Sequence, residues 1–222
     1  MDKKNIRVFF EKKDRAIYIS HLDLLRTMQR ALKRSGLPVW YSEGFNPRIY
    51  LNFPLALSLG TEGVRESMDM AIVDDVSFEE IRERLNSACP EGIRIVSAAY
   101  PIHLNKEIGF AEYETVFSGD AEALKAAVSR YISRESIMVM KHSKKKGMIE
   151  VDIKHHINIL SVSECEKGIK TALRLPAGNE LNLNCAVFTE SFLEYCNSCE
   201  VSAELCCAKR TNIFCEDGTV FE

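Results

Sequence analysis

The residues best suited to chemistry lie between positions 20 and 48, where histidine, carboxylates, arginines and aromatic residues follow one another closely. His21 is the acid–base candidate, because an imidazole with an ordinary pKa of about 6.5 titrates around neutral pH. A small-substrate enzyme using His21, Asp23 and Glu43 is therefore one hypothesis. The structural alternative is that Ser20-His21-Leu22-Asp23 forms a helix capping box.

Anion binding is the second chemistry, and it centres on the helix expected over residues 20–35. Successive residues turn by about 100° around a helix axis. One face then carries Leu25, Met28 and Leu32, and the opposite face carries Asp23, Arg26, Arg30 and Arg34. A row of guanidinium groups suits phosphates or carboxylates. The alternative is a solvated helix face on which Asp23 neutralises Arg26.

The loop that follows combines aromatic, amide and basic residues over positions 41–48. Gly44 permits a positive φ angle, and Asn46-Pro47 favours a defined turn. Aromatic rings beside cations are typical of surfaces that bind single-stranded nucleic acid, which is one interpretation of this loop. The alternative interpretation is a rigid structural loop. The predicted substrate-binding residues are Arg26, Arg30, Lys33, Tyr41, Ser42, Phe45, Asn46 and Arg48.

The distribution of charge favours a binding face in the same region. The chain of 222 residues has a net charge of −3. Residues 1–50 hold 11 basic and 5 acidic residues, whereas the remainder holds 18 and 27. A basic segment on an acidic body indicates an anionic partner for one face, although uneven charge is also common in small domains.

The composition is that of a globular protein, 46% hydrophobic and 27% charged. The sequence lacks an apolar run long enough for a transmembrane helix, and its N-terminus lacks the apolar core of a signal peptide. We therefore expect a cytoplasmic protein without a membrane partner. The eight cysteines should be reduced thiols in that compartment.

Metal or cluster binding has weaker support in the sequence. Cys196 and Cys199 have a spacing that zinc sites use. Cys196 and Cys199 also match the last two positions of the C-x3-C-x2-C motif with which a radical enzyme usually holds its iron–sulfur cluster. The first cysteine of that motif would lie at position 192, which is phenylalanine. We expect no intrinsic cofactor and no radical chemistry in this chain.

The expected elements give an α+β class with two ferredoxin-like (split βαβ) units packed together. Residues 1–103 follow the order strand, helix, strand, strand, helix, strand, with Ser20 and Ser77 as helix caps. Residues 104–222 form a second, decorated unit. In that unit a short helix is expected after Thr189 and a closing strand over residues 201–208. The basic turn at residues 144–146 is expected at a hairpin tip, as an auxiliary phosphate contact or only an exposed turn.

Several uncommon clusters occur in a specific order: Tyr18-Ile19-Ser20-His21-Leu22-Asp23, Arg26, Arg30-Ala31, Gly36-Leu37-Pro38-Val39, Tyr41-Ser42-Glu43-Gly44-Phe45-Asn46-Pro47, Pro54-Leu55 and Leu59-Gly60. In these clusters the chain resembles the radical SAM-linked protein family, known as domain of unknown function 2344. The resemblance is strongest over residues 5–75. It implies a radical S-adenosylmethionine protein as partner and a connection with RNA or ribosomes, without implying an activity.

Three functions follow as hypotheses. The leading one is a non-catalytic companion module that binds RNA or another anionic substrate through the basic N-terminal face. The second is a protein-interaction subunit that makes no contact with nucleic acid. The third is the small-substrate enzyme described above.

Overall fold

The computed structural model describes residues 3–143, 147–178 and 181–222 of this α+β protein. The chain forms two compact units. Unit 1 comprises residues 1–109 and 210–222, and unit 2 comprises residues 110–209. The C-terminal segment thus belongs to the N-terminal unit, a feature that the predicted division at residues 103 and 104 did not include. None of the described helices is long and apolar enough to cross a membrane.

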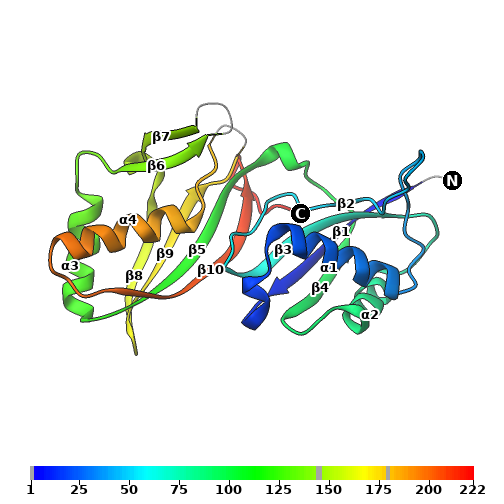
Figure 1. Ribbon diagram of the computed structural model, residues 1–222, viewed down its shortest axis with the longest axis horizontal. Helices are drawn as coiled ribbons and strands as arrows, with labels where there is room; N and C mark the ends of the chain where they lie inside the picture. Colours follow the sequence, from blue (N-terminus) through cyan, green and yellow to red (C-terminus); the bar gives the residue numbers. More distant parts are fainter. Residues whose placement is uncertain (1–2, 144–146, 179–180) are drawn as a thin grey trace. The chain divides into compact units, whose positions relative to one another are not determined.

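Unit 1 places two helices on one face of an antiparallel sheet (Figure 1). Strand β4 pairs with β1, and β1 pairs with β3. The short β2 and strand β10 (Glu204–Cys215) both adjoin β3. The elements are β1 (Lys4–Lys12), α1 (His21–Arg34), β2 (Leu51–Asn52), β3 (Glu62–Ile72), α2 (Phe78–Ala88) and β4 (Ile93–Ala99). Short 3-10 helices cover Asp14–Tyr18 and Asn105–Glu107.

Unit 2 repeats this order of elements with a hairpin inserted after its first helix. Its strands lie in the order β10-β5-β9-β8, and the hairpin β6–β7 forms a separate two-stranded sheet. The elements are β5 (Ile108–Ser118), α3 (Ala121–Ile132), β6 (Met138–Ser143), β7 (Gly147–Asp152), a 3-10 turn (Lys154–His156), β8 (Asn158–Cys165), β9 (Gly168–Pro176), α4 (Cys185–Ser198) and β10 (Glu204–Cys215).

The helix starts are set by local capping. The Ser20 hydroxyl accepts a hydrogen bond from the Asp23 amide at 3.2 Å, and Ser77 does the same for Glu80. Both caps confirm the predicted starts of α1 and α2, because a side-chain acceptor satisfies an amide that the helix leaves unpaired. Asp120 caps α3 in the same way.

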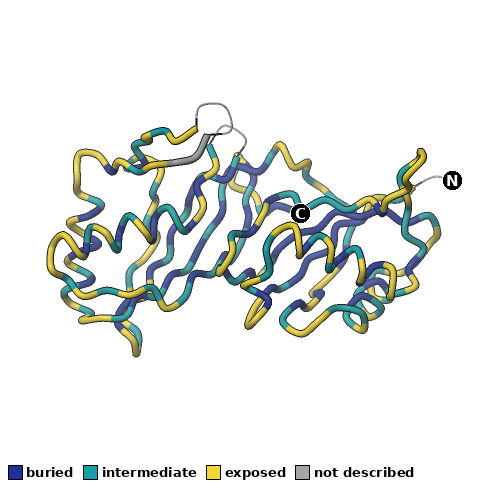
Figure 2. The backbone as a smooth tube through the Cα atoms, viewed as in Figure 1, coloured by how far each residue is buried: buried dark blue, intermediate teal, exposed yellow. Residues whose placement is uncertain are grey.

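The core of unit 1 lies between the sheet and its helices. Ile6, Val8 and Phe10 alternate along β1 toward the buried side of α1, which includes Met28 and Leu32. The buried positions follow the strands and the inner sides of the helices (Figure 2). The opposite side of β1 is covered as well, because Phe221 lies against the Arg7 guanidinium at 4.1 Å.

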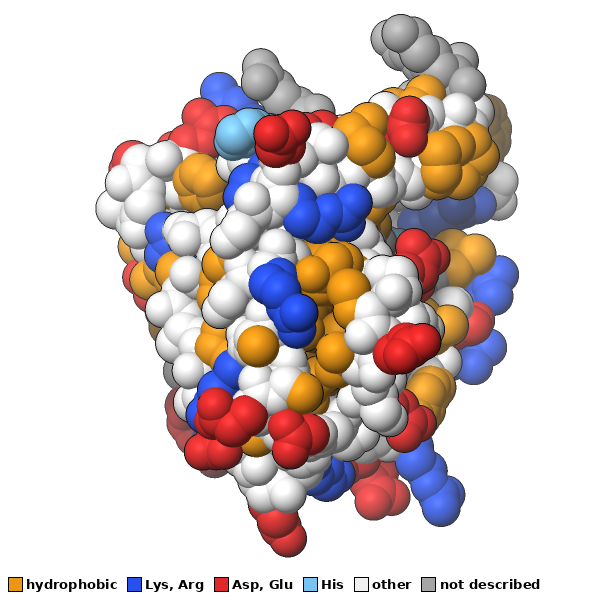
Figure 3. Space-filling model, turned by 90° about the vertical axis from the view of Figure 1, so that its left-hand side faces the viewer, with side chains coloured by type: hydrophobic (Ala, Val, Ile, Leu, Met, Phe, Trp, Pro, Cys, Tyr) orange, Lys and Arg blue, Asp and Glu red, His pale blue; other side chains and the backbone are white. Residues whose placement is uncertain are grey.

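Unit 2 has an aromatic core and some exposed apolar surface. The ring of Phe192 lies 5.0 Å from that of Phe117 and 5.5 Å from that of Tyr131, measured between centroids. The inserted hairpin exposes Met138 and Met148. On the face of unit 2 seen in Figure 3, hydrophobic side chains form a strip among charged ones. Exposed apolar surface of this kind is typical of interaction sites.

Two predictions for unit 2 were wrong in position. Helix α4 begins at Cys185, capped by Asn184, well before the predicted start after Thr189. Strand β10 extends to Cys215 rather than ending at residue 208. The hydrophobic pattern did not reveal the start of α4, because this helix is apolar on several sides. The predicted basic turn at residues 144–146 lies outside the described residues.

Candidate functional site

Helix α1 supplies one wall of the candidate site. Its Ser20 cap fixes the start of the helix, and Leu24, Met28, Ala31 and Leu32 anchor its inner side in the core. The helical spacing predicts Leu25 on this buried face. Instead Leu25 is only half-buried and turns toward the groove, while Leu24 takes the core position. The amphipathic helix therefore presents its outer residues at a fixed height above the sheet.

The segment over residues 41–49 supplies the opposite wall. Tyr41 and Ile49 form an antiparallel bridge. The Ser42 amide donates to the Arg48 carbonyl at 2.8 Å, and the Arg48 amide donates to the Ser42 hydroxyl at 3.0 Å. Gly44 has a φ angle of 118°, which allows the chain to reverse at the tip. These bonds fix the backbone from which Tyr41 and Arg48 project.

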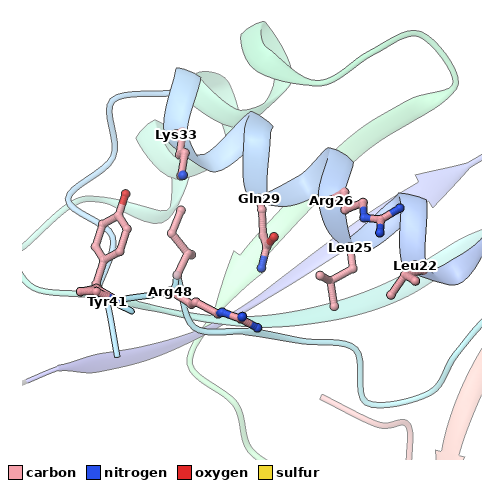
Figure 4. Close-up of a pocket in the computed structure, with 9 residues that line it drawn as sticks. Leu22, Leu25, Arg26, Gln29, Lys33, Tyr41 and Arg48 are labelled. Atoms are coloured by element: carbon pink, nitrogen blue, oxygen red, sulfur yellow. The ribbon is translucent and has the colours of Figure 1, made fainter. Parts of the chain in front are cut away.

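Between these walls lies a groove with a volume of about 350 Å³. In Figure 4, Leu25 and Gln29 extend from α1 toward the space that Arg48 enters from the other side. Apolar and cationic side chains share this lining. The lining residues are Leu22, Leu25, Arg26, Gln29, Lys33, Tyr41, Pro47, Arg48 and Ile49.

A second hollow lies on the outer side of α1 and has a volume of about 270 Å³. It is lined by Arg26, Gln29, Arg30 and Lys33, all of them polar. Arg26, Gln29 and Lys33 border both hollows, so they form a ridge between the outer hollow and the groove.

The cations of the site differ in their partners. Arg26 donates to the Asp23 carboxylate at 3.1 Å. Hydrogen bonds from the Ser20 hydroxyl and then Arg26 hold the pKa of Asp23 below its usual value, so this carboxylate stays charged at neutral pH. Within the described part of the chain, Arg30, Lys33 and Arg48 form no ion pair. Their charges are therefore available to an anionic ligand.

The structure brings together some of the predicted binding residues and separates others. Arg26, Lys33, Tyr41 and Arg48 line the groove, and Arg30 lines the outer hollow. Ser42 holds the loop closed through its two hydrogen bonds with Arg48. Phe45 and Asn46 are exposed near the tip of the loop and are not among the groove's lining residues.

Arg34 has a structural role that the row of arginines did not reveal. Its guanidinium donates to the Ala88 carbonyl, at the end of α2, at 2.6 Å. Arg84 of α2 in turn donates to the Gly36 carbonyl, just after α1, at 3.2 Å. Each helix thus donates a guanidinium hydrogen bond to a backbone carbonyl at or just beyond the C-terminal end of the other helix. Arg34 therefore tethers α2, whereas Arg30 and Lys33 on the same helix remain directed at the hollows.

The residues of the enzyme hypothesis have other surroundings. The His21 ring packs edge-on against Phe53, with 5.4 Å between centroids. Asp23 is bonded to Ser20 and Arg26, and Glu43 is exposed on the loop. The lining residues of the groove do not include His21, Asp23 or Glu43. These three residues therefore lie outside the lining of the basic groove.

The cysteine pair considered for zinc lies at the end of α4. Cys196 is buried, whereas Cys199 is exposed at the helix terminus. Burial raises the pKa of the Cys196 thiol to about 11, so this thiol is protonated at neutral pH. Across the described ranges, no group of three or more histidine, cysteine or acidic side chains is placed to hold a metal ion.

Sequence reasoning missed five lining residues: Leu22, Leu25, Gln29, Pro47 and Ile49. A signal for two of them was present. Leu22, Arg26, Gln29 and Lys33 are spaced by four, three and four residues, which places them along one side of a helix. The basic residues alone predicted the neighbouring row Arg26, Arg30 and Arg34 as the binding face.

Comparisons with known proteins give a family but no activity. No curated protein matches this chain. One similar solved structure is described as a "putative glycine cleavage system transcriptional repressor"; the match has 13% identity, 97% coverage of this chain, 100% coverage of that chain and a TM-score of 0.24. A family model described as "Uncharacterized protein conserved in bacteria (DUF2344)" matches residues 5–185. Since that match covers most of the sequence, the chain belongs to this bacterial family.

Proposed function

We propose that this chain is a non-catalytic binding module that holds RNA through its phosphate groups on the face formed by α1 and residues 41–49. The observation that carries the proposal is the convergence of Arg30, Lys33 and Arg48 on two adjoining hollows, without an ion pair among the described residues. Unpaired cations on one face attract a polyanion at little cost in desolvation.

RNA is favoured over a small anion by the extent and composition of this face. The cations of α1 recur along two helical turns, which span roughly 10 Å. This length suits a chain of phosphates better than one isolated anion. Tyr41 adds an aromatic ring to a groove that is also lined by cations. Proteins bind single-stranded nucleic acid with this mixture, because the ring stacks on a base and the cations neutralise phosphates.

We propose that a radical S-adenosylmethionine protein acts on the bound RNA, with this chain as its companion module.

We further propose that both units are variants of the ferredoxin-like fold. Their strand orders, β4-β1-β3-β2 and β10-β5-β9-β8, correspond position by position when the hairpin β6–β7 is set aside.

The test is a titration of fluorescently labelled single-stranded RNA at several salt concentrations. The Arg30→Ala/Lys33→Ala variant should bind more weakly, and the slope of log K against log salt should fall by about 1.4, or about 0.7 for each lost phosphate contact. Lys125→Ala is a matched control, because Lys125 lies on α3 and pairs with Glu122. Unchanged affinity and slope in the double variant would contradict RNA binding at this face.

An apolar surface beside α1 supports a second candidate, a protein-docking role without nucleic acid. The Gly60 amide donates to the Ile17 carbonyl at 2.9 Å, which brings the chain on either side of these residues together. Tyr18 and Leu59 are 72% and 64% exposed there. Co-purification of a partner that survives both ribonuclease and high salt, together with absent RNA binding, would favour this role.

A further inference from the structure

We propose that the groove beside α1 receives one unpaired nucleobase of an RNA strand, while the phosphates of that strand lie on the outer hollow. This inference rests on the RNA-binding function proposed above and specifies how the ligand is recognised. It assigns different parts of the nucleotide to the two hollows on either side of the ridge formed by Arg26, Gln29 and Lys33.

The two hollows differ in the chemistry of their lining. The outer hollow has only polar residues, three of them cationic, which suits a phosphate with its full charge. The groove adds Leu22, Leu25 and Ile49 to its cations. Contact with these apolar side chains does not stabilise a bound phosphate, whereas it does stabilise a bound base, which buries its flat face against them. The groove thus suits the apolar part of a nucleotide.

Gln29 and Tyr41 give the groove the two contacts by which proteins hold an unstacked base. The Gln29 amide has both a donor and an acceptor, as the edge of a base does, and it has no hydrogen-bond partner among the described residues. Tyr41 is 42% exposed and offers a ring face for stacking. Figure 4 shows both residues on the border of the same space.

The size of the groove limits how much of the strand can enter. Its volume of about 350 Å³ lies at the lower end of the range for small-molecule sites, which suits one base rather than several stacked bases. The bases of a duplex are paired and stacked, and removing one from the helix costs a few kcal/mol. The groove should therefore select single strands over duplexes.

The test compares three labelled probes by fluorescence anisotropy: a short single-stranded RNA, the same strand in a duplex, and an abasic ribose-phosphate strand of the same length. We expect the native protein to bind the single strand at least about tenfold more tightly than the other two. Tyr41→Ala should weaken single-strand binding by about tenfold and leave abasic binding unchanged. Gln29→Ala should weaken single-strand binding more than abasic binding, because Gln29 also lines the outer hollow. Thermal unfolding checks that both variants are folded.

The outcomes separate this inference from the function on which it rests. Equal affinity for all three probes, reduced for all of them by Arg30→Ala/Lys33→Ala, would overturn base insertion and leave phosphate binding intact. Single-strand selectivity that persists in both Tyr41→Ala and Gln29→Ala would also overturn base insertion in this groove. Failure of the native protein to bind any probe would overturn both proposals.

Discussion

Two regions of unit 1, the interior of its sheet and the groove beside α1, hold basic side chains in contrasting settings. Arg7, Lys12 and Arg210 are each no more than 2% exposed. Arg30 and Lys33 are exposed beside the groove. Each buried cation has specified protein partners, whereas the exposed ones form no ion pair in the described ranges. The same residue types thus stabilise the fold in one region and remain available to a ligand in the other.

The buried arginines join segments that are far apart in the sequence. Arg7 donates to both carboxylate oxygens of Asp69, at 2.7 and 2.9 Å, and to the Glu222 carbonyl at 2.8 Å. Arg210 pairs with Glu66 and donates to the Leu55 carbonyl at 2.9 Å. Residues 210–222 are therefore held in unit 1 by charge-assisted hydrogen bonds.

The positive charge of residues 1–50 is not all on the surface of the protein. Two of its cations, Arg7 and Lys12, contribute to the positive balance of residues 1–50 but are inside the protein. A charge count therefore overstates the basic surface. Only the positions around α1 and Arg48 support the proposed RNA-binding face.

Removal of a buried arginine should have the largest effect. Arg210→Ala leaves the Glu66 carboxylate buried without its ion-pair partner, and we expect a loss of about 3–5 kcal/mol in the free energy of unfolding. Urea denaturation followed by circular dichroism measures this loss. The Glu66→Leu/Arg210→Met double variant should lose less, because neither member of this ion pair is left buried without the other. A loss below about 1 kcal/mol in Arg210→Ala would mean that the buried pair does not anchor residues 210–222.

Lys12 should make stability depend on pH at alkaline values. Its ammonium group donates to the Ile17 and Ile19 carbonyls, each at 3.2 Å. Desolvation by burial lowers its pKa below the ordinary value of 10.5, and nearby Arg210 lowers it further although Glu66 opposes the change. The folded state therefore binds fewer protons than the unfolded state between the two pKa values. Stability should rise with pH across that window, because the cost of burying the charge disappears.

The measurement compares the native protein with Lys12→Met over the alkaline range. The free energy of unfolding of the native protein should increase relative to that of the variant by about 1.4 kcal/mol for each pH unit between the folded and unfolded pKa values. Lys125→Met, at a half-exposed position on α3, serves as the control and should show no such relative rise. A constant difference between the native protein and Lys12→Met would contradict the desolvation of Lys12.

Arg34 should show an intermediate behaviour, since it is exposed but bonded. Loss of its hydrogen bond to the Ala88 carbonyl in Arg34→Ala should reduce the free energy of unfolding by about 0.5–1 kcal/mol. RNA affinity should change less than in Arg30→Ala, because Arg34 does not line either hollow. Thermal unfolding and anisotropy on the same samples measure both effects. A larger loss of RNA affinity in Arg34→Ala than in Arg30→Ala would place the ligand elsewhere on α1.

Local signals explain which parts of the structure the sequence could predict. The caps at Ser20 and Ser77 depend on residues three positions away, so the starts of α1 and α2 were readable. The burial of Arg7 depends on Phe221, more than two hundred positions later, and no local pattern contains that contact. The α+β class followed from the order of elements, whereas the return of residues 210–222 to unit 1 did not.

The candidate site was predictable in its charges but not in its shape. Arg26, Lys33 and Arg48 were identified by type and position, and they do share a groove. Phe45 was grouped with Tyr41 because both are aromatic, yet the turn at Gly44 carries Phe45 to an exposed position outside the groove lining. Gln29 drew no attention because one amide in a helix carries no signal until a cavity is seen beside it.

The most direct test of the contrast measures stability and RNA affinity on one variant, Arg30→Ala/Lys33→Ala. Because these side chains form no ion pair within the described chain, the free energy of unfolding should stay within about 0.5 kcal/mol of the native value. Single-stranded RNA affinity and its salt dependence should both fall. A stability loss as large as that of Arg210→Ala, or native RNA affinity in the double variant, would contradict the assignment of these cations to a ligand.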